Sequence, residues 1–492
     1  MGVLDELTKN RRRVLLSILG LLLVASAVRF YHIGWSFSNN GIDEGIMLER
    51  ALMVDHGYRL YSDLPCDQAP LAFYLGSAFG GDVLASRALV AGLSILAIGA
   101  CMLASAKMRG PRAMVLASLL LSLDFVFLRE SRLFSLDALS SSFIAFSIPV
   151  FFLYIQKGSR AMLALAGLLV GLSTASKLLG ALALVGMLAF MLLEWRRDGK
   201  GVSRLVADAI VVVLAAALPV LAFMAYLGPD EMLRGMVLDQ GQRGFDLFLK
   251  LSILAYFGLN IAYIVPISHA RMLWRSSKEA RYLLCLVFVM LVFMIVQPLV
   301  FLHHMALLSP PLAILAGVVI SEMLKANKSD VRSDGENDLN DKKAANLSIA
   351  APVLAAAILI SAAYAGYGLL AQKEPFQEVY AQWLEGRTAP EDFVISGDPT
   401  ICAYAHRMMP PDIVNVAYRQ HEELTLERIE DAIDGYNVSV VIVCYMLNDI
   451  DGLTQYLVSS GFVKTIIASD SSTEAALDLF QEGIGPVTVY VR

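Results

Sequence analysis

Residues 205–227, LVADAIVVVLAAALPVLAFMAYL, form the stretch that decides the fold class of this chain. The segment holds a single charged side chain, Asp208, among residues that are otherwise almost all apolar. An α-helix needs about 20 apolar residues to cross the hydrocarbon core of a bilayer. The segment therefore predicts a transmembrane helix.

Similar segments recur along the chain and predict an α-helical multi-span membrane protein. Hydrophobic residues make up 57% and charged residues 17% of the 492 residues, whereas soluble proteins carry about 25% charged residues. This composition excludes a soluble enzyme, a disordered chain and a nucleic-acid-binding protein as descriptions of the whole chain. We predict about eleven spans, at 14–33, 86–106, 113–128, 136–156, 161–176, 178–193, 205–227, 247–268, 281–301, 305–323 and 347–370.

Basic residues gather in every second loop between the predicted spans. Loops rich in Lys and Arg stay in the cytoplasm, so we predict a cytoplasmic N-terminus and, after an odd number of spans, an extracytoplasmic C-terminus. The basic loops are Lys9 with Arg11, Arg12 and Arg13, then Lys107, Arg109 and Arg112, then Lys157 and Arg160, then Arg196, Arg197, Lys200 and Arg204, and finally Arg271, Arg275, Lys278 and Arg281.

The charge distribution divides the chain into a basic membrane body and an acidic C-terminal part. Residues 372–492 carry seven basic and 19 acidic side chains, while the net charge of the whole chain is −6. This acidity argues against nucleic acid or anionic lipid as a partner of the C-terminal part. The predicted domains are 1–323 (membrane body, with a first outer loop at 34–85), 324–346 (polar cytoplasmic linker), 347–370 (last span) and 371–492 (outer domain).

The outer domain is predicted to be a small α/β domain. Strand patterns at VIS 394–396, VSVVIVCY 438–445 and the final VTVYVR alternate with helical patterns. The helical stretch 424–433 is amphipathic, and Thr425 suits its N-cap. The five cysteines are widely spaced and predict neither a disulfide framework nor a zinc site, although a Cys402–Cys444 bridge stays open.

Ionisable residues cluster at the predicted outer ends of the spans, where such groups are functional candidates by default. The adjacent acids Asp43 and Glu44 could ligate a divalent metal such as Mg²⁺ or Mn²⁺, or one of them could act as a general base. A third interpretation is a helix N-terminus that the acids stabilise. The stretch GIMLERALMVDHG that follows is amphipathic and predicts a helix on the membrane surface.

Three further groups lie on the same predicted side of the membrane. Arg129, Arg132 and Asp137 could hold a phosphate, although arginines also anchor helices at the interface. Lys177 interrupts two apolar segments and requires an anionic partner or access to water. His303 and His304 suit metal, phosphate or the interface. Paired acids beside cations favour transfer of a group from a phosphorylated donor.

These motifs resemble the GT-C superfamily of polyprenyl-phosphate-sugar glycosyltransferases. The similarity is greatest to the branch with the dolichyl-phosphate-mannose protein mannosyltransferases and the aminoarabinose transferases. It extends over roughly 30–320 in layout. The motifs are Asp43-Glu44, Asp67-Gln68-Ala69-Pro70-Leu71, Arg132 with Asp137, Thr174-Ala175-Ser176-Lys177, and His304 with Pro310-Pro311.

The resemblance implies a function and a set of roles. The protein would transfer a sugar, with a mannose-like hexose favoured, from a polyprenyl-phosphate donor to a protein, lipid or glycan acceptor outside the cytoplasm. Asp43 would be the base, with Glu44 beside it. Asp67 would contact metal or donor, and His304 would be the second metal candidate. Arg129, Arg132 and Lys177 would bind the lipid phosphate, and Asp137 would orient the arginine.

Two other functions stay open from the sequence. A transporter or lipid flippase would place charges near the bilayer midplane on broken helices and would show inverted repeats, and neither feature is evident. An inactive scaffold with this fold is the second alternative. The chain is shorter than the eukaryotic mannosyltransferases of the family and has no disulfide framework, which favours a prokaryotic plasma membrane.

Overall fold

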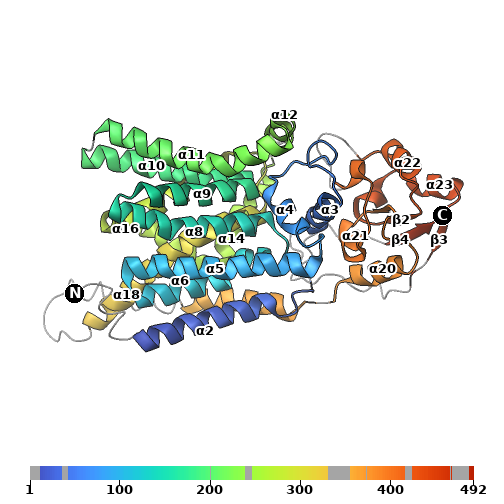
Figure 1. Cartoon of the computed structure of the whole chain (residues 1–492). Helices are drawn as coiled ribbons and strands as arrows, with labels where there is room; N and C mark the ends of the chain where they lie inside the picture. Colours follow the sequence, from blue (N-terminus) through green and yellow to red (C-terminus); the bar gives the residue numbers. More distant parts are fainter. Residues whose placement is uncertain are drawn as a thin grey trace.

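The computed structural model describes residues 11–35, 43–199, 201–238, 246–330, 355–372, 374–415, 424–465, 467 and 487–492. These residues form a bundle of helices with a smaller α/β domain at one end (Figure 1). Six helical stretches are long and apolar enough to cross a membrane. Their helices are α5 (Val83–Arg109), α8 (Leu136–Lys157), α10 (Ala181–Asp198), α11 (Val202–Leu227), α17 (Lys278–Val296) and α18 (Ser309–Asp330).

Shorter or broken helices fill the remaining predicted span positions. A bent pair, made of η3 (Phe248–Lys250) with α14 (Leu251–Leu259) and η4 (Ile261–Tyr263) with α15 (Ile264–Ser268), turns by 93°. A long helix, the bent pair or a shorter apolar helix stands at each of the eleven predicted segments. The shorter ones are α2 (Arg11–Phe30), α6 (Pro111–Leu123), α9 (Arg160–Ser176) and Ala355–Leu370.

Two of the predicted boundaries differ from the structure. The span expected at 113–128 is broken at Asp124, whose side chain accepts a hydrogen bond from Phe127 N and thereby caps α7 (Phe125–Glu130). Helix α18 runs on to Asp330, into the region expected to be the start of the linker. The rest of that linker, and the beginning of the last predicted span, lie outside the described residues.

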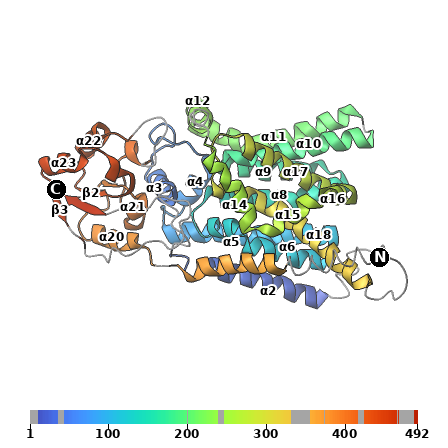
Figure 2. The same cartoon turned by 180° about the vertical axis from the view of Figure 1, so that it is seen from behind.

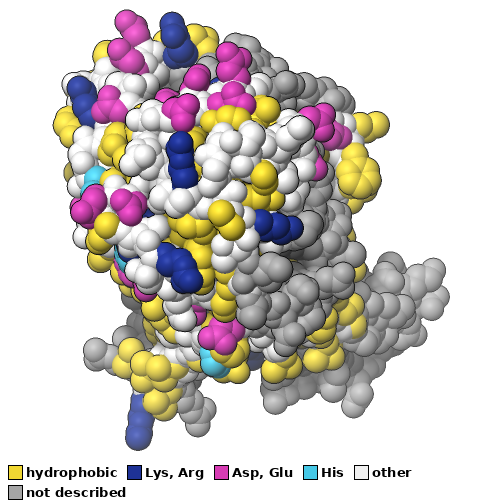
Figure 3. All heavy atoms as spheres, turned by 90° about the vertical axis from the view of Figure 1, so that its right-hand side faces the viewer, with side chains coloured by type: hydrophobic (Ala, Val, Ile, Leu, Met, Phe, Trp, Pro, Cys, Tyr) yellow, Lys and Arg dark blue, Asp and Glu magenta, His cyan; other side chains and the backbone are white. Residues whose placement is uncertain are grey.

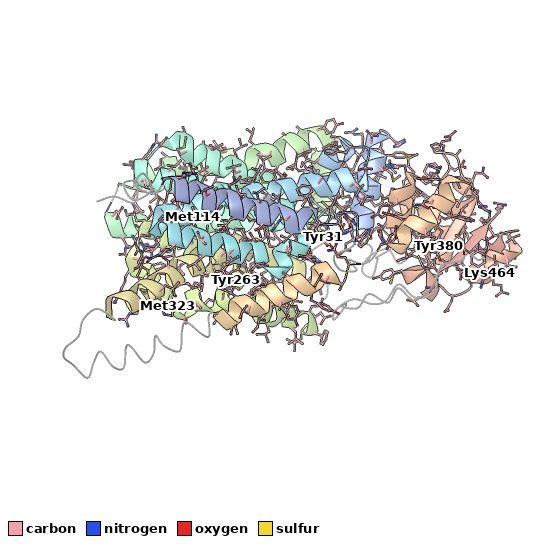
Figure 4. The ribbon with its side chains drawn as sticks, turned by 90° about the horizontal axis from the view of Figure 1, so that it is seen from below. Tyr31, Met114, Tyr263, Met323, Tyr380 and Lys464 are labelled. Carbon is pink, nitrogen blue, oxygen red and sulfur yellow. The ribbon has the colours of Figure 1, made fainter. Side chains whose placement is uncertain are left out.

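The two ends of the bundle differ in charge. At the end far from the α/β domain, ion pairs join the helix ends. Arg281 binds Glu194 at 2.6 Å, and Arg109 lies 3.4 Å from Glu322. In Figure 4, Tyr31 marks the end of α2 that is near the α/β domain, and Met323 marks the opposite end of the bundle. Most of the predicted basic loops therefore gather at the far end, while the candidate site residues lie at the near end.

The first predicted outer loop lies between the bundle and the α/β domain (Figures 1 and 2). It contains α3 (Asp43–Asp55) and α4 (Leu71–Ser77). The expectation that α3 lies on the membrane surface is wrong, because most of its residues, charged Glu44, Glu49 and Arg50 among them, are buried. Helix α21 of the α/β domain and helix α4 both pack against α3, and α3 is therefore covered by protein.

The α/β domain is built on a four-stranded mixed sheet of order β1-β2-β4-β3. β1 and β2 are parallel, and β4 is antiparallel to both of its neighbours. β2 is buried along its whole length, as its run of β-branched residues predicts. The strands are β1 (Val394–Ser396), β2 (Val440–Val443), β3 (Val463–Thr465) and β4 (Thr488–Val491), and the helices are α20 (Phe376–Glu385), α21 (Pro399–Ala405), α22 (Leu426–Gly435) and α23 (Leu453–Ser459).

Several local features of this domain follow the sequence. Thr425 caps α22 by accepting a hydrogen bond from Arg428 N, as expected. Cys402 and Cys444 are both buried and are free thiols, so the open question of a bridge is answered against it. On the surface, acidic side chains are spread over the described part of the domain with basic ones among them (Figure 3).

Candidate active site

Asp43 begins α3 and is accessible to solvent, whereas most of the helix that follows it is buried. Neighbouring protein atoms nevertheless reduce the hydration of the carboxyl group, which raises its pKa above the ordinary aspartate value. The positive charges of Lys177 and Arg129 oppose this shift, and the negative charges of Asp67 and Asp137 add to it. Asp43 is thus an accessible carboxyl group within an electrostatic cluster.

Glu44, the other member of the acid pair, has a different environment. Its carboxylate accepts hydrogen bonds from Arg87 Nε at 2.8 Å and Arg87 Nη2 at 2.7 Å, and a third from Phe134 N at 2.8 Å. Glu44 is 4% exposed and Arg87 is 1% exposed. This bidentate ion pair holds the start of α3 against α5. Glu44 is therefore buried and paired, whereas its neighbour Asp43 is exposed.

Lys177 lies between α9 and the short helix η1 (Leu178–Gly180), where it meets the anionic partner that its position requires. Its Nζ donates to Asp137 Oδ2 at 2.5 Å. Asp137 is in the first turn of α8, and both side chains are largely buried. His303, on η5 (Leu302–Leu308), places Nε2 4.0 Å from the same Asp137 oxygen. The structure therefore brings three separate sequence clusters together.

Arg129 and Glu130 end α7 beside this group. Arg129 Nη1 lies 3.7 Å from Glu130 Oε1, and Ser135 Oγ donates to Glu130 Oε2 at 2.5 Å. Burial raises the pKa of Glu130 to about 7, and the charge of Arg129 acts against that shift. The positive charge of Arg129 thus acts on both Glu130 and Asp43.

The charge of Asp67 acts on Asp43, but the carboxylate of Asp67 already has two side-chain partners. Arg50 Nη1 lies 3.5 Å from Asp67 Oδ1, and Gln68 Nε2 donates to Asp67 Oδ2 at 3.3 Å. Arg50 is buried and also donates to Pro65 O at 2.8 Å. Asp67 thus belongs to a hydrogen-bonded support for the loop before α4.

Arg132 lies apart from these contacts. Its guanidinium donates to the carbonyl groups of Val28, Arg29, Tyr31 and His32 at the end of α2, and to Gln372 Oε1 at 2.6 Å. A cation at a helix C-terminus satisfies carbonyl groups that have no partner within the helix. Arg132 therefore joins the end of α2 to the segment that leads into the α/β domain.

The predicted metal ligands Asp67 and His304 are not assembled into a metal site. Oxygen-binding cations take several carboxylate or carbonyl ligands, and the described residues contain no group of three or more His, Cys, Asp or Glu side chains arranged to hold a metal ion. His304 stacks edge-on against Phe301 and His303. The described side chains around Asp67 and His304 therefore do not form the metal site that the sequence suggested.

Two residues of this region, Arg87 and Glu130, were not predicted. Arg87 carried a usable signal, since an arginine at the start of an apolar segment needs a buried partner. Glu130 was visible as a neighbour of predicted residues, and His303 was a candidate beside His304 but its contact with Asp137 was not expected. Their contacts depend on the turns that end α7 and begin η5, which local sequence does not determine.

A family model described as dolichyl-phosphate-mannose-protein mannosyltransferase matches residues 67–223. This segment runs from Asp67 through α4–α11 and includes Arg129, Asp137 and Lys177. No curated protein matches the sequence.

Solved structures match over nearly the whole chain. ArnT from Cupriavidus metallidurans bound to undecaprenyl phosphate aligns with a TM-score of 0.65 at 14% identity, over 98% of each chain. The oligosaccharyltransferase AglB from Archaeoglobus fulgidus, in complex with an inhibitory peptide and a dolichol-phosphate, aligns with a TM-score of 0.54 at 16% identity, over 89% of this chain and 69% of AglB. A structure of the same enzyme with Zn and sulfate gives 0.56 at 16% identity, over 87% and 67%.

Part of the chain thus matches a mannosyltransferase family model, and the chain as a whole shares its fold with ArnT and AglB. The predicted fold class, a multi-span helical protein with a small α/β domain, is thereby confirmed.

Proposed function

We propose that this protein transfers a sugar from a polyprenyl-phosphate donor to an acceptor on the outer side of a plasma membrane, with Asp43 as the general base. The observation that carries the proposal is the accessible Asp43 carboxyl group beside the cations Lys177 and Arg129. ArnT and AglB have this fold, and they have been solved with undecaprenyl phosphate and dolichol-phosphate, which supports a lipid-linked donor.

The proposed reaction is a direct displacement. Asp43 accepts the proton of the acceptor nucleophile, whose lone pair forms the new bond to the anomeric carbon. The bond from that carbon to the phosphate oxygen breaks, and its electron pair leaves with the polyprenyl phosphate. One base and one displacement invert the anomeric configuration. A single accessible carboxyl group suits this reaction, since Glu44 is held by Arg87.

Lys177 and Arg129 are the proposed phosphate-binding residues. The leaving phosphate gains negative charge as the bond breaks, and fixed cations stabilise that charge most strongly where water is excluded. Both side chains are largely buried, and the charges of both act on Asp43. In this proposal Asp137 orients Lys177 through the 2.5 Å contact between them.

The proposed orientation rests on the positions of the charges. The basic loops at the far end of the bundle would face the cytoplasm, and Asp43 and the α/β domain would then lie outside. A mannose-like hexose is the favoured donor sugar because the matching family model describes mannosyltransferases. The structure of AglB in complex with Zn is the reason to measure metal dependence.

The test is donor consumption in membranes that contain the full chain, with radiolabelled polyprenyl-phosphate mannose and polyprenyl-phosphate glucose as donors. Loss of label from the lipid that depends on the protein supports a transferase, and mannose over glucose supports the hexose assignment. Chelator, Mg²⁺ and Mn²⁺ arms decide the metal requirement. Movement of intact donor across the membrane without cleavage would instead support a flippase.

Lys177→Met is expected to reduce kcat/KM for the donor about 100-fold, the usual cost of removing one electrostatic group from a transition state. The physical cause is the loss of a fixed cation at the leaving phosphate. Initial rates with purified protein measure it. Lys177→Arg keeps the charge and should retain more activity, and Lys464→Met, on the exposed surface of the α/β domain, should match wild type. Equal rates for Lys177→Met and wild type would remove Lys177 from the site.

Arg129→Ala and Arg132→Ala are expected to have different effects, although the residues are three positions apart. Arg129→Ala should raise the donor KM about tenfold, the loss of one charge-assisted hydrogen bond. Arg132→Ala should leave KM unchanged and lower stability by about 1–3 kcal/mol, because carbonyl groups at the end of α2 lose their donor. Donor titrations and thermal unfolding measure the two effects. A raised KM in Arg132→Ala alone would reverse the assignment.

A further inference from the structure

Helix α3 carries Asp43 and is held from two sides. On the bundle side, Glu44 is paired with Arg87, and Gly76 and Gly81 let the chain approach Ala51 and Leu52. A Cβ added to Gly81 would lie 2.8 Å from Leu52 Cβ. The other side of α3 faces the α/β domain, as Figures 1 and 2 show. The position of Asp43 therefore depends on two contact surfaces, of which only the first belongs to the membrane body.

The contact with the α/β domain is unusually close at Gly45, two residues after Asp43. A Cβ added to Gly45 would lie 2.3 Å from Thr400 N and 2.9 Å from Pro399 C, both backbone atoms of the first turn of α21. Backbone atoms cannot move aside as a flexible side chain does. Only glycine lets α3 and α21 approach so closely. The contact lies two residues after the proposed base, Asp43, on the same helix.

A second contact joins the two parts further along α3. Glu49 is 0% exposed, and its Oε1 accepts a hydrogen bond from Met409 N, which lies just beyond α21, at 2.6 Å. Its other oxygen, Oε2, is buried and has no hydrogen-bond partner among the residues that the structure describes. Burying a carboxyl group that is only partly paired costs free energy, and an apolar residue would pack at lower cost. A residue that is costly for stability but fixes geometry is better explained by specificity of docking than by stability.

We propose that Gly45 and Glu49 are positioning residues for the transfer reaction, which fix α3 against the α/β domain so that Asp43 is held at the donor. The acidic α/β domain is then a working part of the active site. This inference rests on the proposed role of Asp43 as the base. Catalytic groups that are misplaced by about 1 Å lose roughly 100-fold in rate, so small movements of α3 have large consequences.

The experiment compares four variants of the full-length protein, purified in detergent. Glu49→Ala removes the acceptor for Met409 N, whereas Glu49→Gln keeps a neutral acceptor of the same shape. Gly45→Ala forces α3 and α21 apart. Asp55→Ala, at the exposed far end of the same helix, is the matched control. Each variant is measured by amide hydrogen exchange over residues 43–55 and by steady-state kinetics with the donor.

Glu49→Ala and Gly45→Ala are expected to exchange the amides of α3 roughly tenfold faster than wild type, with exchange in the bundle helices unchanged. Their kcat should fall about 100-fold while the donor KM stays within about twofold. Glu49→Gln and Asp55→Ala should match wild type in both measurements. A purely structural role would accelerate exchange throughout the bundle, which is not the proposed pattern.

Unchanged exchange over 43–55 in Glu49→Ala and Gly45→Ala would overturn the inference, since the contacts would not hold α3. Faster exchange with an unchanged kcat would also overturn it, because α3 would be loosened without consequence for the reaction. Failure of the proposed function is a separate result: wild type and Asp43→Asn would then consume donor equally. The exchange measurement needs no turnover, so it still decides whether the α/β domain holds α3.

Discussion

Asp43→Asn is expected to reduce sugar transfer about 10²- to 10⁴-fold, the range that a positioned general base contributes. Asparagine has nearly the same shape, but its amide cannot accept the acceptor's proton. Because the substitution removes only this step, KM for the donor should change little. Donor consumption by purified protein under saturating donor and acceptor measures kcat directly.

The matched control is Asp55→Asn, which lies on the same helix and is exposed to solvent. It should retain wild-type rates, and both variants should accumulate to wild-type amounts. If Asp43→Asn keeps more than about a tenth of the wild-type kcat, Asp43 is not the base. Asp67, Glu130 and Asp137 would then be the next acids to test, and each would need the same substitution.

The membrane architecture could be predicted from the sequence because its cause is local. A run such as 205–227 has one low-energy arrangement in a bilayer, and the structure has α11 there. The same reasoning predicted a partner for Lys177, because a lone cation between apolar segments is costly. The partner, Asp137, was already one of the candidate residues, and the structure joins the two at 2.5 Å.

The roles of neighbouring residues could not be separated in this way. Arg129 and Arg132 have the same charge and lie on the same short segment. Their directions are determined by distant groups, since the carbonyl groups that bind Arg132 come from α2, some hundred residues earlier in the chain. Asp43 and Glu44 likewise differ only because Arg87 reaches one of them.

The burial of α3 was hidden for a similar reason. Its amphipathic pattern gave the correct helix, but the pattern does not distinguish lipid from protein as the apolar neighbour. One of the elements that cover it, α21, follows more than 300 residues later. One sign was present in the sequence, because a surface helix does not usually carry Glu49 among apolar residues on the side that faces lipid.

The second large effect is expected at the pair formed by Arg87 and Glu44. Arg87→Met should destabilise the protein by about 3–5 kcal/mol, the cost of leaving one member of a buried ion pair without its partner. The loss extends beyond the pair, since Arg87 Nη1 also donates to Ile33 O at 3.0 Å and Gly34 O at 2.7 Å. Denaturant unfolding of purified protein in detergent measures the change.

A second substitution, at Glu44, distinguishes the contribution of the Arg87–Glu44 ion pair from the other contacts of Arg87. In the double variant Arg87→Met with Glu44→Gln, no buried charge is left unpaired, and the glutamine can still accept the hydrogen bond from Phe134 N. The loss of stability in the double variant should therefore be smaller than the sum of the losses in Arg87→Met and Glu44→Gln, by a coupling free energy of about 0.5–3 kcal/mol. Additive effects would contradict a direct pair. An Arg87→Met protein within about 1 kcal/mol of wild type would contradict its role in holding α3. Because Asp43 is the residue next to Glu44, the single variant should also lose transfer activity in the fraction that stays folded.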